Sequence, residues 1–417
     1  MILTLSDIEA AGRMLDGKVV RTPFEHSVTL SEITGASVFL KFENRQFTAS
    51  FKDRGALVRL ADLTAPQRER GVIALSAGNH AQGVAYRARQ MGVPSTIVMP
   101  VSTPFGKIGS TELLGATVIL HGDSVSEGEA FVQERAEADG LTVVHPYDDP
   151  RIIAGQGTVG LEMLRAVPDL DCLVVPIGGG GLIAGIAVAA KALKPGIRII
   201  GVEVESYPSM HHGLRGWSLP TAGPTIAEGI AVKRPGVNTM PVVRQLVEDI
   251  VLVSEARLEH AVQLMAEIEK QVVEGAGAAS LAAVLSEPER FAGQRAGLVV
   301  SGGNIDSRLL SSVLMRGLVR SGRLVRIRVQ TADQPGALAR AAQVIAKAGG
   351  NIVDVHHQLW FEDVPVKLVE VEFVLETRDA NHVERIMAAL ADTGMRPERV
   401  QAGHSRTNRP APAQPAL

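Results

Sequence analysis

Between residues 51 and 200, short apolar runs alternate with stretches of helical periodicity, and this rhythm constrains the fold most strongly. The apolar runs predict strands at residues 72–75, 95–99, 117–120, 142–144, 173–177 and 197–202. The other stretches predict helices at residues 55–63, 82–91, 104–114, 126–139, 154–166 and 183–193. Because strands that alternate with helices form parallel sheets covered by those helices, the sequence predicts an α/β fold with open parallel sheets.

The flanking segments extend this pattern. Ser6, followed by acidic residues, is typical of a helix N-cap, so a helix is expected to begin there. Residues 36–43 place apolar side chains on one face at period two, which predicts a strand that leads toward Lys52. Further expected elements are helices at residues 258–273 and 277–285 and a strand at residues 297–300.

The pattern changes near Gly322, where a cleanly alternating strand begins. The predicted elements are strands at residues 324–329, 352–359 and 366–376 and helices at residues 337–347 and 381–393. This β-α-β-β-α order predicts a small ferredoxin-like α+β domain at residues 323–397. Residues 398–417 are rich in Pro, Ala and polar residues, which predicts a disordered tail.

Composition excludes several classes of protein. Hydrophobic residues make up 46% of the 417 residues and the net charge is −3, so we expect a globular protein without a general attraction to nucleic acid. Every apolar stretch is shorter than the roughly 18 residues of a membrane span. A single cysteine, Cys172, excludes an internal disulfide framework. The N-terminus carries no signal-peptide pattern, so a cytoplasmic location is expected.

Three segments that each follow or flank a predicted strand carry polar or glycine-rich patterns. They are Thr48–Gly55, which contains Lys52, then Ser76–His80, and Gly178–Gly181. A lone lysine is usually a solvated surface charge, and glycine-rich turns are common. Together, however, an amine nucleophile, a polar turn and an anion cradle at strand ends predict a Schiff base with pyridoxal phosphate (PLP).

Individual roles follow from chemistry. Gly178, Gly179, Gly180 and Gly181 let backbone N–H groups approach a phosphate at the start of a helix. A dinucleotide site would need a G-x-G-x-x-G spacing and a later acidic residue, for which Glu203 is a weak match. Burial beside Phe51 would lower the pKa of Lys52. Asn79 can donate to the cofactor's phenolic oxygen, or can simply be a turn residue.

The substrate carboxylate is expected at the second segment. Backbone N–H groups of Ser76, Asn79 and His80 are candidates to bind it. The alternative for His80 is a buried histidine with its hydrogen bonds satisfied.

These segments, with Ser301-Gly302-Gly303-Asn304, resemble the threonine ammonia-lyases (threonine dehydratases) of the tryptophan-synthase-β-like, fold type II class of PLP enzymes. The resemblance covers about residues 5–320 and implies a catalytic domain at residues 1–320, with a smaller subdomain inserted at about 50–150. The C-terminal domain resembles an ACT domain, a regulatory amino-acid-binding unit, through Asp333–Leu338.

The resemblance implies that Lys52 holds the cofactor and removes the Cα proton of the substrate. Phe51 would pack near the cofactor ring, and the four glycines would hold its phosphate. Ser301 would face the pyridine nitrogen and leave it largely unprotonated, which favours prompt loss of the β-hydroxyl. The implied reaction converts L-threonine to 2-oxobutanoate and ammonia, with L-serine as a second substrate.

Three residues depart from the patterns of relatives. Ala77 stands where serine racemases carry a second serine, so racemisation is expected to be poor. Glu203 matches a metal ligand of those relatives, but Ser209 replaces a carboxylate, so no confident metal site is predicted. Asp53 is an acidic residue at a position where many dehydratases carry an apolar residue and threonine synthases often carry an acid, so threonine synthase activity stays in view. The alternative to a functional role for Asp53 is a surface ion pair with Arg54.

Other functions and the regulation stay open. A 3-hydroxyaspartate ammonia-lyase, a serine racemase and a non-catalytic amino-acid sensor are the alternatives. Paired ACT domains in a dimer or tetramer would create an allosteric site near Gly336 and Asn351 for an amino acid or a nucleotide. Isoleucine biosynthesis and amino-acid breakdown are both compatible with the implied reaction.

Overall fold

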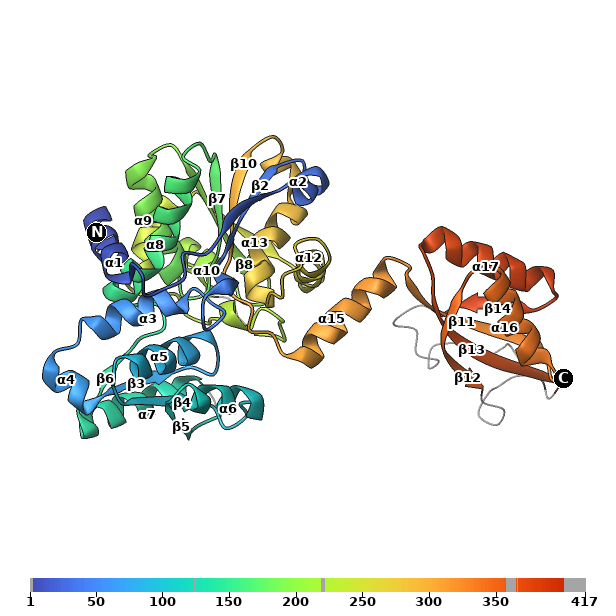
Figure 1. The fold of residues 1–417 in the computed structure, drawn as a ribbon, viewed down its shortest axis with the longest axis horizontal. Coiled ribbons are helices and arrows are strands. Elements are labelled where there is room, and N and C mark those ends of the chain that lie inside the picture. Colours follow the sequence, from blue (N-terminus) through green and yellow to red (C-terminus); the bar gives the residue numbers. More distant parts are fainter. Residues whose placement is uncertain (1–2, 124, 219–221, 358–364, 366, 401–417) are drawn as a thin grey trace. The chain divides into compact units, whose positions relative to one another are not determined.

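The structure, a computed structural model, describes residues 3–123, 125–218, 222–357, 365 and 367–400 (Figure 1). The chain forms two compact units, residues 1–309 and residues 310–417. Helix α15 (Ser307–Arg320) spans the boundary between them. Within the described ranges, none of the helices combines the length and the apolar character that a membrane crossing requires.

The first unit is built around a large sheet whose strands follow the order β1-β2-β10-β7-β8-β9. Its strands are β1 (Phe24–Ser27), β2 (Ser37–Phe42), β7 (Cys172–Pro176), β8 (Arg198–Val204), β9 (Asp249–Val253) and β10 (Arg295–Val300). β1 is antiparallel to β2, and the other neighbours are parallel. Every residue of β7 is buried, as expected for a parallel strand with helices on both faces.

A smaller parallel sheet, of order β5-β4-β3-β6, forms from the chain between β2 and β7. Its strands are β3 (Val72–Leu75), β4 (Ser95–Met99), β5 (Thr117–Leu120) and β6 (Thr142–Val143). The apolar runs therefore predict these four strands to within one residue. In Figure 1 this sheet and its helices lie below the large sheet, with α3 between the two.

The helices of the first unit pack on both faces of its sheets. They are α1 (Leu5–Leu15), α2 (Val28–Thr34), α3 (Lys52–Ala61), α4 (Ala65–Arg70), α5 (Asn79–Gln90), α6 (Phe105–Leu113), α7 (Val125–Asp139), α8 (Pro150–Ala166), α9 (Gly181–Leu193), α10 (Ser209–Arg215), α11 (Thr239–Leu246), α12 (Glu255–Glu267), α13 (Gly275–Ser286) and α14 (Pro288–Phe291), with 3-10 turns η1 (Glu43–Arg45) and η2 (Glu228–Ile230). The core between α8, α9 and the large sheet consists of buried aliphatic side chains such as Val159, Ile186 and Leu173.

The second unit is an antiparallel sheet of order β12-β13-β11-β14 with two helices. Its elements are β11 (Leu324–Ala332), α16 (Ala337–Lys347), β12 (Asn351–His357), β13 (Leu368–Glu376), α17 (Ala380–Asp392) and β14 (Arg396–Arg399). Alternate residues of β11 and β13 join the helices in one apolar core. β14 pairs with β11, so residues 398 and 399, predicted as tail, lie in a strand. Residues 401–417 lie outside the described residues.

Several boundaries differ from the sequence prediction. The N-cap of α1 is Thr4, whose hydroxyl accepts from the Asp7 N–H in a capping box, so the prediction of Ser6 is wrong. α12 ends at Glu267 because the chain turns through Lys270, whose φ of 56° no helix accommodates. β1 and β9 were not predicted. β1 is an exposed edge strand without an apolar alternation, which explains why its sequence gives no signal.

Candidate active site

Lys52 is the first residue of α3, and its side chain is half-buried beside the Phe51 ring, with Nζ 5.1 Å from the ring centroid. Nζ donates a hydrogen bond to the Pro146 carbonyl at 2.6 Å. Burial lowers the pKa of Lys52 to about 8, although the negative charge of Glu274 opposes this shift. A much larger fraction of this amine than of an ordinary lysine is therefore unprotonated near neutral pH, which favours its action as a nucleophile.

The loop before Lys52 is fixed by the segment that follows β10. The Phe51 N–H donates to the Ser301 carbonyl at 3.1 Å, and the Gly303 N–H donates to the Ala49 carbonyl at 2.8 Å. Ala49 adopts a left-handed φ of 54°, which costs conformational energy for a residue with a side chain. The pairing with the β10 segment offsets this cost, so two predicted site segments are brought together.

The four glycines form the turn between β7 and α9, where their backbones are closely approached on all sides. A Cβ on Gly179 would lie 2.2 Å from the Tyr147 ring, and a Cβ on Gly181 would lie 2.7 Å from the Tyr147 carbonyl. Gly180 has a φ of 95°, which strongly favours glycine. The first N–H groups of α9 have no intrahelical acceptors, so this turn offers donors to an anion such as a phosphate.

The second anion-binding candidate is the N-terminus of α5, where Gly78 is the N-cap. The N–H groups of Asn79 and His80 lie in its first turn and lack intrahelical acceptors. The prediction for the Ser76 N–H is wrong, because that group donates to the Val98 carbonyl at 3.1 Å. The Ser76 hydroxyl accepts from the Gly78 N–H at 3.2 Å and orders the turn instead.

His80 is buried, and its Nε2 lies 2.9 Å from the Val144 carbonyl. Burial lowers its pKa to about 3, so the ring is neutral and Nε2 is the protonated nitrogen that donates to this carbonyl. The imidazole is therefore a structural side chain, whereas the backbone N–H of the same residue stays available to an anion.

Asn79 is held by the side chain of Glu274, which the sequence analysis did not single out, and by that of Asn304, to which it assigned no role of its own. Its Nδ2 donates to Glu274 Oε1 at 2.6 Å, and its Oδ1 accepts from Asn304 Nδ2 at 2.6 Å. Asn304 Nδ2 also donates to the Thr48 carbonyl at 2.8 Å. These contacts fix the amide orientation of Asn79 and leave one of its two N–H bonds free of Glu274.

Glu274 is the N-cap residue of α13, and its carboxylate is buried. Burial raises the pKa of this carboxylate to about 7, although the hydrogen bond from Asn79 opposes the shift. The available sequence signal was an acidic residue in a run of Val, Gly and Ala at residues 272–279. Such a residue is a candidate functional group, because a buried carboxylate requires a reason.

Ser301 follows β10 and is buried, and its hydroxyl donates to the Ala276 carbonyl at 3.1 Å. Its hydroxyl oxygen keeps the capacity to accept a hydrogen bond. Ser301 thus lies at the carboxyl end of a strand, as do Asn79 after β3 and the glycine turn after β7, for which the strand pattern predicted this position. Its contact with a pyridine nitrogen stays a prediction.

Glu203 lies in β8, and its carboxylate accepts from the Met210 and His211 N–H groups at 2.8 and 2.9 Å. It therefore caps α10. Burial raises its pKa to about 7. Among the described residues, no group of three or more His, Cys, Asp or Glu side chains is arranged to hold a metal ion.

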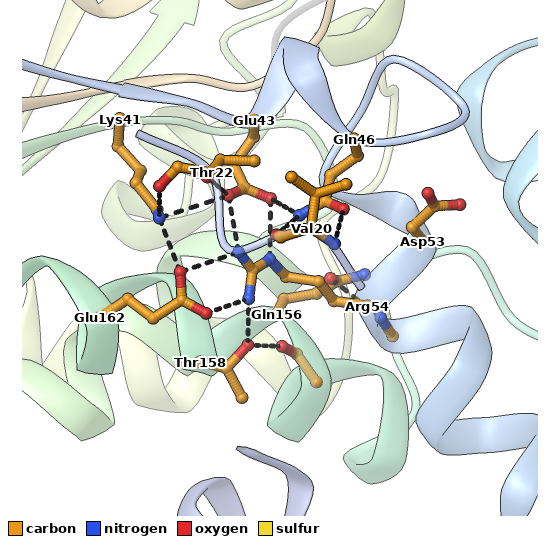
Figure 2. Close-up of polar contacts among 12 residues, drawn as sticks. Val20, Thr22, Lys41, Glu43, Gln46, Asp53, Arg54, Gln156, Thr158 and Glu162 are labelled. Atoms are coloured by element: carbon orange, nitrogen blue, oxygen red, sulfur yellow. Dashed lines mark hydrogen bonds and ion pairs between the residues drawn. The ribbon is translucent and has the colours of Figure 1, made fainter. Parts of the chain in front are cut away.

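Arg54 lies beside the site in a buried network of charged side chains (Figure 2). Its guanidinium binds Glu43 through two hydrogen bonds of 2.8 Å and Glu162 through bonds of 2.7 and 3.0 Å. Lys41 Nζ donates to Glu162 at 2.6 Å and to the Thr22 carbonyl at 2.7 Å. The network links β2, η1, α3 and α8, so it fixes the first turn of α3 relative to β2 of the large sheet.

Asp53 is fully buried and does not pair with Arg54, so the alternative of a surface ion pair is wrong. In Figure 2 it points away from the Arg54 network. Its carboxylate accepts from the Thr48 hydroxyl at 2.7 Å and lies 3.5 Å from Arg87 Nη2. This acidic residue thus faces α5 and the loop rather than Lys52 Nζ.

Residues 15–302 match the family of pyridoxal-phosphate dependent enzymes. The chain belongs to this family. Residues 321–393 match the ACT domain. A protein of Thermotoga maritima named L-threonine ammonia-lyase is 45% identical to this chain over 94% of this chain and 98% of that protein.

Two solved structures share the fold of the first unit. Maize serine racemase has a TM-score of 0.71 at 34% identity, covering 77% of this chain and 99% of the other. Threonine deaminase isoform 2 of Solanum lycopersicum has a TM-score of 0.70 at 34% identity, covering 75% of this chain and 86% of the other. The fold type II α/β architecture with a C-terminal ACT domain is therefore confirmed.

The residues present fit pyridoxal phosphate. Lys52 supplies an amine of lowered pKa, and the glycine turn supplies N–H donors in a space that any side chain would fill. Asn79 and Ser301 add polar groups of fixed orientation. These groups come from α3, α5, α9 and the end of β10, so the fold brings them together from four separate parts of the sequence.

Proposed function

We propose that this chain is a PLP-dependent L-threonine ammonia-lyase that converts L-threonine to 2-oxobutanoate and ammonia and also accepts L-serine. The observation that carries the proposal is the identity of 45% to a protein named L-threonine ammonia-lyase over 94% of this chain. The geometry supports it, because Lys52 packs on α5 through Gly83 and its Nζ bonds the carbonyl of Pro146, whose neighbour Tyr147 lies against the glycine turn.

Bound PLP supplies an aldehyde for the lysine amine and an electron sink for the substrate's Cα. The chain's own groups then have separate tasks. The N–H groups at the start of α5 orient the substrate carboxylate, and the glycine turn holds the phosphate. Lys52 Nζ, with a pKa of about 8, accepts the Cα proton as a general base. Glu274 and Asn304 fix the orientation of Asn79 and leave one of its N–H bonds available, which would donate to the cofactor's phenolic oxygen.

Racemisation of serine is the second candidate, because maize serine racemase shares this fold. Inversion at Cα needs a second acid on the face opposite to the general base. Ala77 occupies the position where the resemblance expects a serine, and a methyl group has no proton to give. Elimination is therefore favoured over racemisation, and 3-hydroxyaspartate is a further substrate to test.

The function is tested with a panel of L-threonine, L-serine and 3-hydroxyaspartate, with detection of the 2-oxo acid. The native protein is expected to give its highest kcat/KM with L-threonine. Lys52→Ala is expected to form no product, whereas Lys191→Ala, which removes a lysine on the outside of α9, retains activity. Full turnover by the Lys52→Ala variant would contradict the proposal.

We further propose that the ACT domain regulates the enzyme in a homo-oligomer. An amino acid or nucleotide would bind near Gly336, which is the N-cap of α16 with a φ of 83°, and Asn351, which begins β12. Removal of residues after Arg320 is expected to abolish any response to isoleucine, valine or AMP and to leave turnover in place. An unchanged response of the truncated protein would refute this. A cytoplasmic location stays a prediction from the sequence.

A further inference from the structure

Asp53 joins three parts of the active site through one buried carboxylate. The Thr48 hydroxyl donates to Oδ1 at 2.7 Å, and the Thr48 N–H donates to Oδ2 at 3.3 Å. Arg87 Nη2 of α5 lies 3.5 Å from Oδ2. The carboxylate therefore connects the loop before Lys52, the first turn of α3 and the helix whose N-terminus faces the substrate.

Arg87 is itself held in place on the α5 side. Its side chain is buried, and Nη1 donates to the Lys18 carbonyl at 2.8 Å and to Gln90 Oε1 at 2.9 Å. α5 also packs directly on the backbone of Lys52, since a Cβ added to Gly83 would lie 3.3 Å from the Lys52 carbonyl carbon. Any shift of α5 thus changes the position of its N-terminus relative to Lys52.

A second set of contacts connects the same loop with the start of α5. The Thr48 carbonyl accepts from Asn304 Nδ2, which also donates to Asn79 at the start of α5. The contacts close a ring that runs from Asp53 through Thr48, Asn304 and Asn79 along α5 to Arg87 and back. The backbone of Lys52 adjoins Asp53 in the sequence and packs on α5, so this ring ties the segment that carries the amine to the helix that carries the carboxylate-binding N–H groups.

We propose that Asp53 and Arg87 are positioning residues that set the distance between Lys52 and the carboxylate-binding N-terminus of α5. Neither side chain touches the substrate. The inference rests on the proposed amino-acid substrate, whose carboxylate α5 must hold while its Cα lies against Lys52. Loss of the pair lets α5 shift, which weakens binding of the carboxylate more than it impairs the amine.

The test compares Asp53→Asn with Arg59→Met in the full-length holoenzyme. Arg59 lies on the same helix, and its Nε pairs with Asp149 Oδ2 at 3.0 Å, away from the ring. Asp53→Asn is expected to raise KM for L-threonine by about tenfold or more, because small misplacements of reacting groups have large kinetic effects. kcat is expected to fall by a smaller factor. Arg59→Met is expected to leave KM unchanged.

Two further measurements separate positioning from stability. The dissociation constant of L-alanine, which has no leaving group, is measured by calorimetry and is expected to rise with KM in Asp53→Asn. The double variant Asp53→Asn/Arg87→Met removes the unpaired buried guanidinium, so its Tm is expected to recover while KM stays raised. If Asp53→Asn does not fold, the double variant and Arg87→Met are compared with Arg59→Met in its place.

An unchanged KM in Asp53→Asn, an equal rise in Arg59→Met, or recovery of KM together with Tm in the double variant would each overturn the inference. Failure of the native protein to act on L-threonine would instead reject the proposed function. The two failures are therefore distinguishable in one set of assays.

Discussion

Two networks of Arg and Glu side chains occupy contrasting environments in this molecule. Arg54, Glu43 and Lys41 are at most 1% exposed, their partner Glu162 is 23% exposed, and together they hold the turn that carries Lys52. Arg328 on β11 faces Glu370 and Glu372 on β13, in a half-buried ladder across the antiparallel sheet of the second unit. The chemistry of the two networks is the same, but the amount of solvent around them is different.

This difference determines what each network contributes. A buried charge is costly without a partner, so removing one member of the first network leaves its partners desolvated and unpaired. In the second network the paired side chains are 12–23% exposed, so water screens their interactions more than in the first network, and each pair contributes less. The first network therefore serves to fix geometry near Lys52, whereas the second one adds only cross-strand pairing.

The largest effect is expected for Arg54→Met. This change leaves Glu43 and Glu162 without their bidentate partner, and the expected loss is about 3–5 kcal/mol of unfolding free energy for the first unit. Denaturant unfolding followed through the absorbance of bound cofactor reports on this unit alone. A loss below about 1 kcal/mol, as for an exposed pair, would remove the distinction between the two networks.

The next largest effect is expected for the stability of the first unit at low pH. Burial raises the pKa of Glu43, but the charges and hydrogen bonds of Arg54 outweigh this, so the net shift is downward from 4.5. The stability from ionised Glu43 is fully present above that value and is lost as pH falls through the lower folded pKa. Glu43→Gln is therefore expected to destabilise the first unit at pH 7, with a difference that narrows below about pH 4. A difference in unfolding free energy between the native protein and Glu43→Gln that stays constant from pH 7 to below about pH 4 would contradict this.

Glu274→Gln extends the comparison of the two networks to a buried carboxylate whose hydrogen-bond partner, Asn79, is neutral. Its charge raises the pKa of Lys52, which burial lowers to about 8. Removal of that charge is expected to move the pKa of Lys52 further down. The pH midpoint for uptake of PLP by the apoprotein, measured by absorbance, should then shift to lower pH. A midpoint that stays in place or rises would show that Glu274 does not act on the amine.

The smallest effect is expected for Arg328→Met. Its partners Glu370 and Glu372 retain contact with water, so the expected loss is less than about 1 kcal/mol in the second unit. Turnover of L-threonine without effector should be unchanged. The measurement is calorimetry of the full-length chain, which resolves its separate unfolding transitions. An isolated 321–400 fragment is not used, because the effect of the substitution on its stability is not separable from the effect of the truncation. A loss as large as that for Arg54→Met would contradict the comparison.

Local patterns in the sequence sufficed for much of the fold. The apolar runs of β3 and β4 match the structure at both ends, because buried parallel strands are continuous apolar segments. The edge strand β5 matches at both ends as well, although its residues are exposed or half-buried. Edge strands such as β1 and β14 lack that signal. The same reasoning placed Lys52 and the glycine turn, whose chemistry depends on residue types that are adjacent in the sequence.

The contacts that orient these groups depend instead on tertiary structure. Glu274 and Asn304 meet Asn79 across sequence separations of 195 and 225 residues, and no local pattern encodes such a meeting. The alternative that Asp53 pairs with Arg54 fails for the same reason, since Arg54 pairs with Glu43 and the partner of Asp53, Arg87, lies on α5. The Ser76 N–H was misassigned because the pairing of β3 with β4 continues one residue past the strand.

The most direct test concerns the amine itself. The holoprotein is treated with borohydride, which makes a lysine–cofactor link permanent, and its peptides are mapped by mass spectrometry. A pyridoxyl group on Lys52 is the predicted result. Its absence from Lys52, or its presence on another lysine, would contradict the central claim that the start of α3 presents the cofactor-binding amine.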